Sequence, residues 1–172
     1  PRRTGLLAAL RLMGADIREE NAARQGGEPV ADLVVRHAPL RGIEVPAARV
    51  ADMIDEFPAL FVAAASAEGV TTVRGAEELR VKESDRIAVM AAGLRVIGGR
   101  IEEAPGGAVI EGGRLRGGTV ESHGDHRIAM AFAVAGAIAG GEVTIRDCAN
   151  VATSFPGFAE LANGCGLMVH AA

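Results

Sequence analysis

The sequence predicts a protein of the α/β or α+β class, built from short helices and strands that alternate along the chain. Segments with apolar residues at helical spacing alternate with short runs rich in Val, Ile and Thr. A motif of helix, glycine and strand also recurs along the chain. The apolar fraction is 49%, with no Trp, no Tyr and five Phe, so we expect a core of Ala, Val, Leu and Ile. Side chains of this size suit small helices packed closely on sheets.

The recurring motif is an amphipathic helix, a glycine that ends it, and a strand. Its first copy, residues 10–19 (LRLMGADIRE), aligns without a gap with residues 94–103 (LRVIGGRIEE). Residues 161–169 (LANGCGLMV) form a weaker third copy, with Gly166 in the position of Gly98. The repetition predicts successive units of similar architecture.

The other elements follow from local signals. Pro58 in the first turn and Gly69 after the last turn delimit one helix. Apolar residues recur at helical spacing after Ser84 and lie nearly all round the segment from Ile128, which predicts one amphipathic and one buried helix. The turn at residues 105–107 (PGG) predicts a hairpin. The predicted helices are residues 58–68, 84–97, 128–138 and 155–163. The predicted strands are residues 31–37, 42–45, 70–73, 101–103, 108–110 and 142–147.

Length, charge and cysteine content limit the possible functions. A chain of 172 residues fits one compact domain, and a net charge of −4 gives no support for a general nucleic-acid or membrane-surface role. The sequence has no apolar run long enough to span a bilayer and no signal-peptide pattern. Cys148 and Cys165 lie far apart, which indicates reduced, buried or half-buried thiols in a cytoplasmic protein. Because the chain begins at Pro1 without Met, we expect a piece of a longer protein.

The first charged cluster is the run LRVKESDR at residues 79–86. Lys82, Glu83 and Arg86 are expected at the approach and first turn of a helix, projecting on one side. Cations there oppose the helix dipole by a few tenths of a kcal/mol each, so stability alone would put them elsewhere. Together with free backbone N–H groups they suit a phosphate or carboxylate. A solvated first turn with local ion pairs explains the same residues equally well.

The second cluster is the run SHGDHR at residues 122–127, directly before the buried helix. Asp125 is a natural N-cap. Arg127 begins an otherwise uncharged apolar helix, where we expect no structural role for a long cation. His126 suits a proton carrier or hydrogen-bond donor, although taken alone a capping or surface histidine is the more common case.

Two further groups precede helices that have Pro in the first turn. Asp55 and Glu56 form a carboxylate pair, but either acid taken alone is better explained as an N-cap. Thr153 and Ser154 are likewise expected to be cap residues. If the repeats bring these four helix N-termini together, they form one cationic, carboxylate-bearing surface for an anionic ligand and acid–base chemistry. The sequence has no Gly-rich phosphate loop and no metal-ligand cluster, so we predict neither cofactor nor metal.

These motifs resemble those of the EPSP synthase family. The resemblance rests on ELRVKESDR (78–86), DHRIAM (125–130), Asp55 within IDEFP and the run ATSFP (152–156), in the family's order and spacing. It extends from Arg3-Thr4-Gly5 to near the end of the chain, and is greatest to the glyphosate-tolerant bacterial branch. It implies an inside-out α/β barrel lobe of repeated βαβαββ units, with helix N-termini facing the cleft. The repeat found in the residues agrees with this.

The resemblance also implies a reaction. Phosphoenolpyruvate and shikimate 3-phosphate would bind between two lobes, and the 5-hydroxyl would receive the enolpyruvyl group as phosphate leaves. Asp55 would act as base, Glu83 as proton donor and acceptor, and Lys82 would contact substrate and stabilise charge. Arg86 and Arg127 would hold phosphoenolpyruvate, with His126 in support. The whole enzyme is expected to be a cytoplasmic monomer.

The chain departs from the family in two ways. Many relatives have Lys where Thr153 stands, so this phosphate contact is absent or supplied differently. Residues 1–172 would form the C-terminal lobe alone, without the N-terminal lobe that mainly holds the shikimate phosphate, so we expect no significant turnover from the isolated chain. Two alternatives stay open: a UDP-N-acetylglucosamine enolpyruvyl transferase-like enzyme, and a non-catalytic module that binds phosphorylated metabolites.

Overall fold

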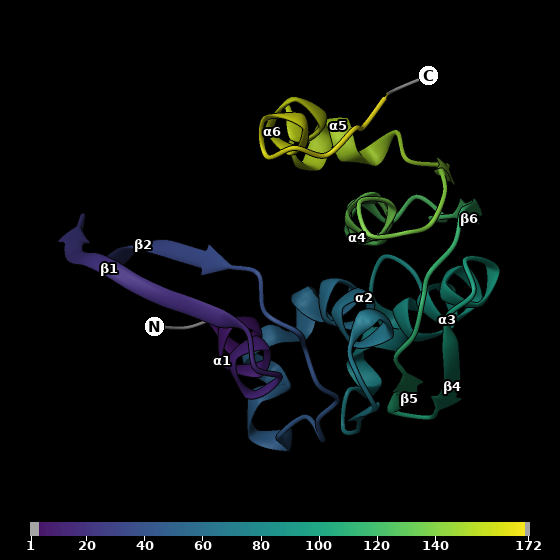
Figure 1. The fold of residues 1–172 in the computed structure, drawn as a ribbon, viewed down its shortest axis with the longest axis horizontal. Coiled ribbons are helices and arrows are strands. Elements are labelled where there is room, and N and C mark those ends of the chain that lie inside the picture. Colours follow the sequence, from purple (N-terminus) through teal and green to yellow (C-terminus); the bar gives the residue numbers. More distant parts are fainter. Residues whose placement is uncertain (1–3, 171–172) are drawn as a thin grey trace.

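The computed structural model describes residues 4–170 and places mixed helices and strands around a helical centre (Figure 1). The predicted α/β class is confirmed. The helices are α1 (Gly5–Leu12), α2 (Phe57–Ser66), α3 (Arg86–Val96), α4 (His126–Gly136), α5 (Asn150–Ser154) and α6 (Phe158–Gly164), with 3-10 helices η1 (Ala47–Arg49), η2 (Ala51–Glu56) and η3 (Glu77–Val81). The strands are β1 (Asp16–Gln25), β2 (Glu28–Arg36), β3 (Val70–Val73), β4 (Arg100–Ala104), β5 (Gly107–Glu111), β6 (Gly118–Glu121) and β7 (Val143–Arg146).

Helix α2 is the centre of the core, and it packs against both α3 and α4. The core is mainly aliphatic, as predicted, with the rings of Phe57, Phe61 and Phe132 added. Helices α3 and α4 approach closely at Gly93, where a Cβ atom would lie 2.3 Å from the ring of Phe132. The small side chains of the sequence therefore allow the close helix packing that was expected.

Two small sheets lie beside these helices. Strands β3, β5 and β4 form an antiparallel sheet in that order, which confirms the hairpin predicted at residues 105–107. Strands β6 and β7 pair in parallel across α4, so this unit is a β-α-β crossover. The sequence reasoning missed β6, because four residues after a Gly-rich stretch give too short a pattern to detect.

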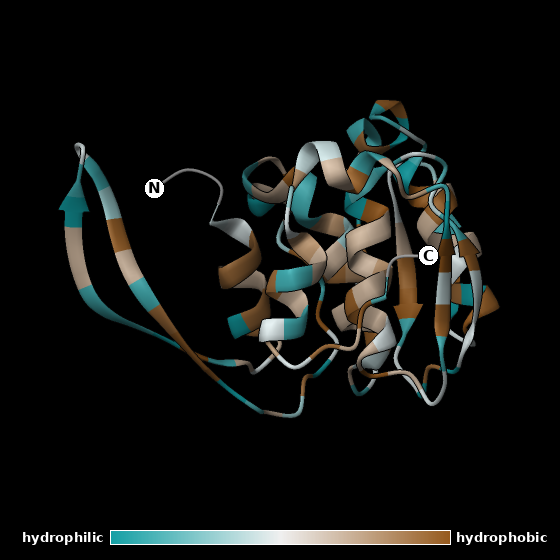
Figure 2. Cartoon of the chain, turned by 90° about the horizontal axis from the view of Figure 1, so that it is seen from above, coloured by the Kyte–Doolittle hydropathy of each residue, from teal (hydrophilic) through white to brown (hydrophobic). Residues whose placement is uncertain are grey.

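A long β1–β2 hairpin reaches away from the body of the molecule (Figure 2). Its turn uses Gly26 and Gly27, both with positive φ (57° and 86°), as tight hairpin turns require. The predicted strand at residues 31–37 falls in β2, but the ten-residue β1 is longer than predicted. Its sequence, DIREENAARQ, is largely polar and exposed, so no apolar alternation marked it. The strand predicted at 42–45 is wrong, since only isolated bridges from Arg41 and Glu44 form there.

The glycine predicted to end the helix of each repeat is confirmed in all three copies. Gly14, Gly98 and Gly166 have left-handed φ angles of 95°, 88° and 92°, and the residue after each donates its N–H back to the helix. This is the hydrogen-bond pattern of a Schellman cap. A strand follows in the first two copies only. In the third, the Asn163 side chain bonds both backbone groups of Val169, at 2.7 and 2.9 Å, in the way a neighbouring strand would.

Two predicted boundaries shift. The last predicted helix, 155–163, is replaced by α5 and α6, which lie beyond α4 (Figure 1). The helix predicted from Ser84 begins at Arg86, because Asp85 is its N-cap and accepts from the Ala88 N–H at 3.0 Å. Within residues 4–170 no helix combines the length and apolarity needed to cross a membrane. Arg3, from the RTG run of the resemblance, lies outside the described residues.

Candidate active site

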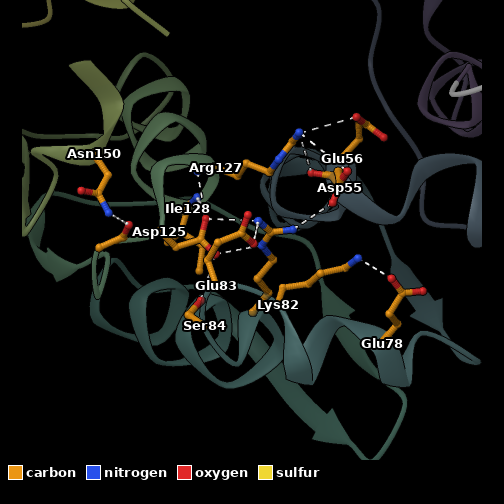
Figure 3. Close-up of polar contacts among 12 residues, drawn as sticks. Asp55, Glu56, Glu78, Lys82, Glu83, Ser84, Asp125, Arg127, Ile128 and Asn150 are labelled. Atoms are coloured by element: carbon orange, nitrogen blue, oxygen red, sulfur yellow. Dashed lines mark hydrogen bonds and ion pairs between the residues drawn. The ribbon is translucent and has the colours of Figure 1, made fainter. Parts of the chain in front are cut away.

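Arg86 is the centre of an ionic cluster with three carboxylates, Asp55, Glu83 and Asp125, which Figure 3 labels. Its side chain is 1% exposed although it is the first residue of α3. Its Nε donates to Asp125 at 2.8 Å, Nη1 to Asp55 at 3.2 Å, and Nη2 to Glu83 at 2.5 Å. A buried arginine needs such partners. The cluster thus joins the N-terminal ends of α2, α3 and α4, as the sequence predicted for three of the four helices.

Asp125 is completely buried and makes two kinds of contact at once. Its carboxylate accepts from the Arg86 guanidinium and the Ser84 hydroxyl, and it caps α4 through the N–H groups of Arg127 and Ile128. The predicted N-cap is confirmed. Burial by itself would raise the pKa of Asp125, but the hydrogen bonds and charge of Arg86 outweigh it and lower that pKa. Burial would likewise lower the pKa of Arg86, and its carboxylate partners raise it instead.

Arg127 ties α4 to the segment before α2. Its Nη1 donates to the Asp55 carbonyl at 3.2 Å, and its guanidinium lies 3.7 Å from the Asp55 carboxylate and 3.6 Å from Glu56. The expectation that this cation has no structural role is therefore wrong. Glu56 occupies the predicted N-cap position of α2, but its side chain accepts no capping hydrogen bond. Arg127 remains 30% exposed, so part of it is accessible.

Lys82 does not join the Arg86 cluster. It ends η3 in an extended backbone conformation, outside α3, and its ammonium forms an ion pair with Glu78 (Figure 3). Lys82 lies on the approach to α3 and not within it, so the helical i,i+4 spacing to Arg86 does not apply. Glu83 does meet Arg86, yet its side chain is 51% exposed. Lys82 and Glu83 thus lie at the rim of the cluster.

A hollow of about 470 Å³ opens beside Glu83. It is lined by Glu83, His123, Gly124, His126, Asn150, Thr153 and Ser154. Thr153 and Ser154 belong to α5, and α6 begins only after Gly157, so the expectation that they cap the last helix is wrong. They contribute hydroxyl groups to the hollow instead.

The sequence reasoning did not select His123 or Asn150. His123 and Gly124 adopt positive φ angles (52° and 69°), and the Asn150 amide donates to the Gly124 carbonyl at 2.5 Å. This bond holds the turn before α4 against the start of α5. His123 lies two residues before a helix cap, and this position could have indicated that it belongs to the site. The contact of Asn150 depends on tertiary structure and could not be predicted from the sequence.

The described residues contain no group of three His, Cys, Asp or Glu side chains arranged to hold a metal ion. Cys148 and Cys165 are both exposed, which corrects the expectation of buried or half-buried thiols. Both lie near the C-terminal end, where the helices α5 and α6 are themselves largely exposed. The hollow has one carboxylate, Glu83, and two histidines, His123 and His126, in its lining, and Glu83 joins it to the Arg86 cluster. This combination suits acid–base chemistry on an anion.

The chain matches the family profile of EPSP synthase (3-phosphoshikimate 1-carboxyvinyltransferase) over residues 2–161. It is 67% identical over 172 residues to the 3-phosphoshikimate 1-carboxyvinyltransferase of Xanthomonas oryzae pv. oryzae strain PXO99A, covering 100% of this chain and 39% of that protein. The Xanthomonas euvesicatoria pv. vesicatoria protein of the same name is 69% identical over 166 residues, 96% of this chain and 38% of its own.

Solved structures give the same result. An EPSP synthase structure from Acinetobacter baumannii superposes with a TM-score of 0.95 at 50% identity, over 98% of this chain and 40% of that one. The enolpyruvyl transferase NikO from Streptomyces tendae has a TM-score of 0.70 at 23% identity, over 96% of this chain and 36% of that one, and shares the fold. The chain therefore spans about 39% of the length of the curated relatives it matches.

Proposed function

The chain belongs to the EPSP synthase family, and on that premise we propose that it forms one lobe of a two-lobed enolpyruvyl transferase. The reaction moves the enolpyruvyl group of phosphoenolpyruvate to the 5-hydroxyl of shikimate 3-phosphate and releases phosphate. The observation that carries the proposal is the Arg86 cluster. It brings Arg86 together with two carboxylates, Asp55 (26% exposed) and Glu83 (51% exposed). Arg127 lies beside Asp55, and Glu83 also lines the hollow. A site that only binds anions gains nothing from carboxylates next to its ligand.

The cations of the site bind the two anionic substrates. Arg127 is partly exposed and binds the phosphoenolpyruvate carboxylate through its planar guanidinium. Arg86 reaches the same carboxylate only when Glu83 or Asp55 releases one of its nitrogen atoms, because all three are engaged. Lys82 leaves Glu78 to contact substrate, and His126 supports the ligand from the wall of the hollow.

The carboxylates move the protons. Asp55 accepts the proton of the 5-hydroxyl as its oxygen bonds to C2 of phosphoenolpyruvate, while protonated Glu83 gives a proton to C3. In the resulting tetrahedral intermediate, the bond from C2 to the phosphate oxygen breaks. Glu83 takes a proton back from C3, which restores the double bond as phosphate leaves. Lys82 stabilises the negative charge that develops during these steps.

The second lobe supplies the rest of the site. In this proposal it mainly holds the phosphate of shikimate 3-phosphate and closes over the hollow, so the 172-residue chain alone gives no significant turnover. The whole enzyme is a monomer of the cytoplasm and needs no metal or cofactor. The proposal rests here on the resemblance to the family and on the 39% of its relatives' length that the chain covers.

The test is a chimera in which these 172 residues replace the matching segment of the Xanthomonas oryzae relative. We expect the chimera to release phosphate from phosphoenolpyruvate and shikimate 3-phosphate, and Glu83→Gln to lower kcat about 10²–10⁴-fold. Glu102→Gln, an exposed carboxylate on β4, is the matched control and should leave kcat unchanged. Turnover with UDP-N-acetylglucosamine instead of shikimate 3-phosphate would favour the first alternative. Substrate binding without any turnover would favour the binding module.

A further inference from the structure

Arg80 lies in η3, outside the hollow and outside the Arg86 cluster, yet every arm of its guanidinium is engaged. Nε donates to the Pro105 carbonyl at 2.7 Å and Nη2 to the Ala104 carbonyl at 2.7 Å. Nη1 donates to the Asp85 carboxylate at 2.8 Å. Arg80 therefore joins the turn between β4 and β5 to the residue just before α3.

Asp85 is held from two sides. One carboxylate oxygen accepts from Arg80, and the other accepts from the Ala88 N–H in the first turn of α3 at 3.0 Å. A cap residue without a second partner can still change its rotamer. With both oxygens engaged, the position of Asp85 is fixed relative to the helix and to the β4–β5 hairpin.

The segment between these two anchors is residues 81–85, and it carries Lys82, Glu83 and Ser84. Val81 is 79% exposed and gives no apolar anchorage, so polar contacts must fix the segment. On the side of the Arg86 cluster, the Ser84 hydroxyl donates to Asp125 and the Glu83 carboxylate accepts from Arg86. Arg80 supplies the outer attachment, through the turn of the β4–β5 hairpin.

From this geometry we infer that Arg80 is a positioning residue, which orders residues 82–84 so that Glu83 is presented to the hollow and Lys82 is held next to it in the chain. This inference rests on the proposed function for the roles of Lys82 and Glu83. Arg80 itself contacts no reacting group. A Lys could not replace it, since a single ammonium lacks the planar fork that reaches two carbonyls and one carboxylate together.

Arg95 provides a matched control at the opposite end of α3. It makes the same types of bond, to the Ile101 carbonyl at 3.0 and 3.3 Å and to the Glu103 carboxylate at 3.0 Å. It ties the C-terminal end of α3 to β4, as Arg80 ties the N-terminal end to the β4–β5 turn. Losing it removes comparable contacts without touching residues 82–84.

The first experiment measures backbone ¹⁵N relaxation in the 172-residue chain and its Arg80→Lys, Arg80→Ala and Arg95→Ala variants. For both Arg80 variants we expect the order parameters of residues 82–84 to fall from about 0.85 to below about 0.6. Arg95→Ala should leave them unchanged. Order parameters that stay high in Arg80→Lys would overturn the inference, and this readout needs no catalytic activity.

The second experiment measures kinetics in the chimera. We expect Arg80→Lys and Arg80→Ala to lower kcat about 10–100-fold, with KM for either substrate changing less than about threefold. Arg95→Ala should keep kcat, and it should lower the melting temperature about as much as Arg80→Ala does. Equal losses of kcat in the Arg80 and Arg95 variants, or none, would overturn the inference. An inactive unsubstituted chimera would instead refute the proposed function, and the relaxation data would still decide whether Arg80 orders the segment.

Discussion

Asp125→Asn tests whether the buried ion pair with Arg86 holds the three helix ends together. The substitution removes the negative charge but keeps a side chain of the same shape, and Asn is as good an N-cap as Asp. The cap of α4 can therefore survive through the Arg127 and Ile128 N–H groups. What is lost is the charge that faces Arg86 in a site where both side chains are at most 1% exposed.

The expected loss follows from this burial. Removing one partner of a buried ion pair destabilises a protein by about 3–5 kcal/mol, because the other charge stays buried without compensation. Arg86 keeps Asp55 and Glu83 as partners, so we expect the lower end of the range, about 3 kcal/mol. An exposed pair gives a scale for comparison: Asp52 lies 3.8 Å from Arg49, and both are half exposed. Asp52→Asn should therefore change the stability by no more than about 1 kcal/mol.

The assay is urea unfolding of the 172-residue chain, followed by circular dichroism at pH 7, for the wild type and both variants. We expect the free energy of unfolding to fall by about 3 kcal/mol in Asp125→Asn, with an unchanged dependence on urea concentration. A loss below about 1 kcal/mol, equal to that of Asp52→Asn, would refute the view that this ion pair organises the site.

The ionic cluster gives two further predictions, and the packing of α3 on α4 gives a third. The pKa of Asp125 is lowered in the folded state, so its stabilisation is complete above the ordinary Asp pKa of about 3.9 and is lost as the pH falls below it. The stability difference between wild type and Asp125→Asn, measured by urea unfolding, should thus shrink below about pH 4. In the chimera, Glu83→Gln should bind phosphoenolpyruvate by calorimetry at least as tightly as the parent, since a neutral side chain holds Arg86 less strongly; weaker binding would contradict this. Gly93→Ala should lower the stability by about 1–3 kcal/mol through the clash with Phe132, whereas Gly164→Ala, with open space around it, should cost nothing measurable.

Local signals predicted most of the fold. Helices α2, α3 and α4 were predicted because their signals are local in the sequence. These signals are the spacing of apolar residues, Pro58 and the glycines that end helices. The repeat predicted only the start of strand β1, because the ten residues of that strand are mostly charged or small, and pairing with β2 rather than burial defines it. The strand prediction at 42–45 failed for the opposite reason: the segment has apolar residues, but only Glu44 forms a bridge to β3, and the other bridge joins Arg41 to Glu68.

The candidate site was predicted in part. Asp55, Glu83, Arg86 and Arg127 do meet, as the clustering of polar residues at helix N-termini indicated. The sequence did not predict which charged side chains pair with one another. The i,i+4 spacing suggested Lys82 beside Arg86, but Asp85 begins the helix after residue 82, which turns Lys82 towards Glu78. Such outcomes depend on where a helix begins to within one turn, and sequence patterns do not fix that.

The burial of the charged residues divides the site into a fixed part and a reactive part. Arg86 and Asp125 are sealed, at 1% and 0% exposure, whereas Glu83 is 51% exposed. A charge that is buried with all its hydrogen bonds made is costly to move, so this pair holds the geometry instead of following the substrate. In the proposed reaction the more exposed groups change partners: Glu83 between Arg86 and the hollow, Lys82 between Glu78 and a ligand. In the proposed reaction, protonation of Glu83 weakens its bond to Arg86 and releases one arm of that guanidinium. The same proton that Glu83 must donate to C3 thus makes Arg86 available to the carboxylate of phosphoenolpyruvate, which couples anion binding to the acid–base step.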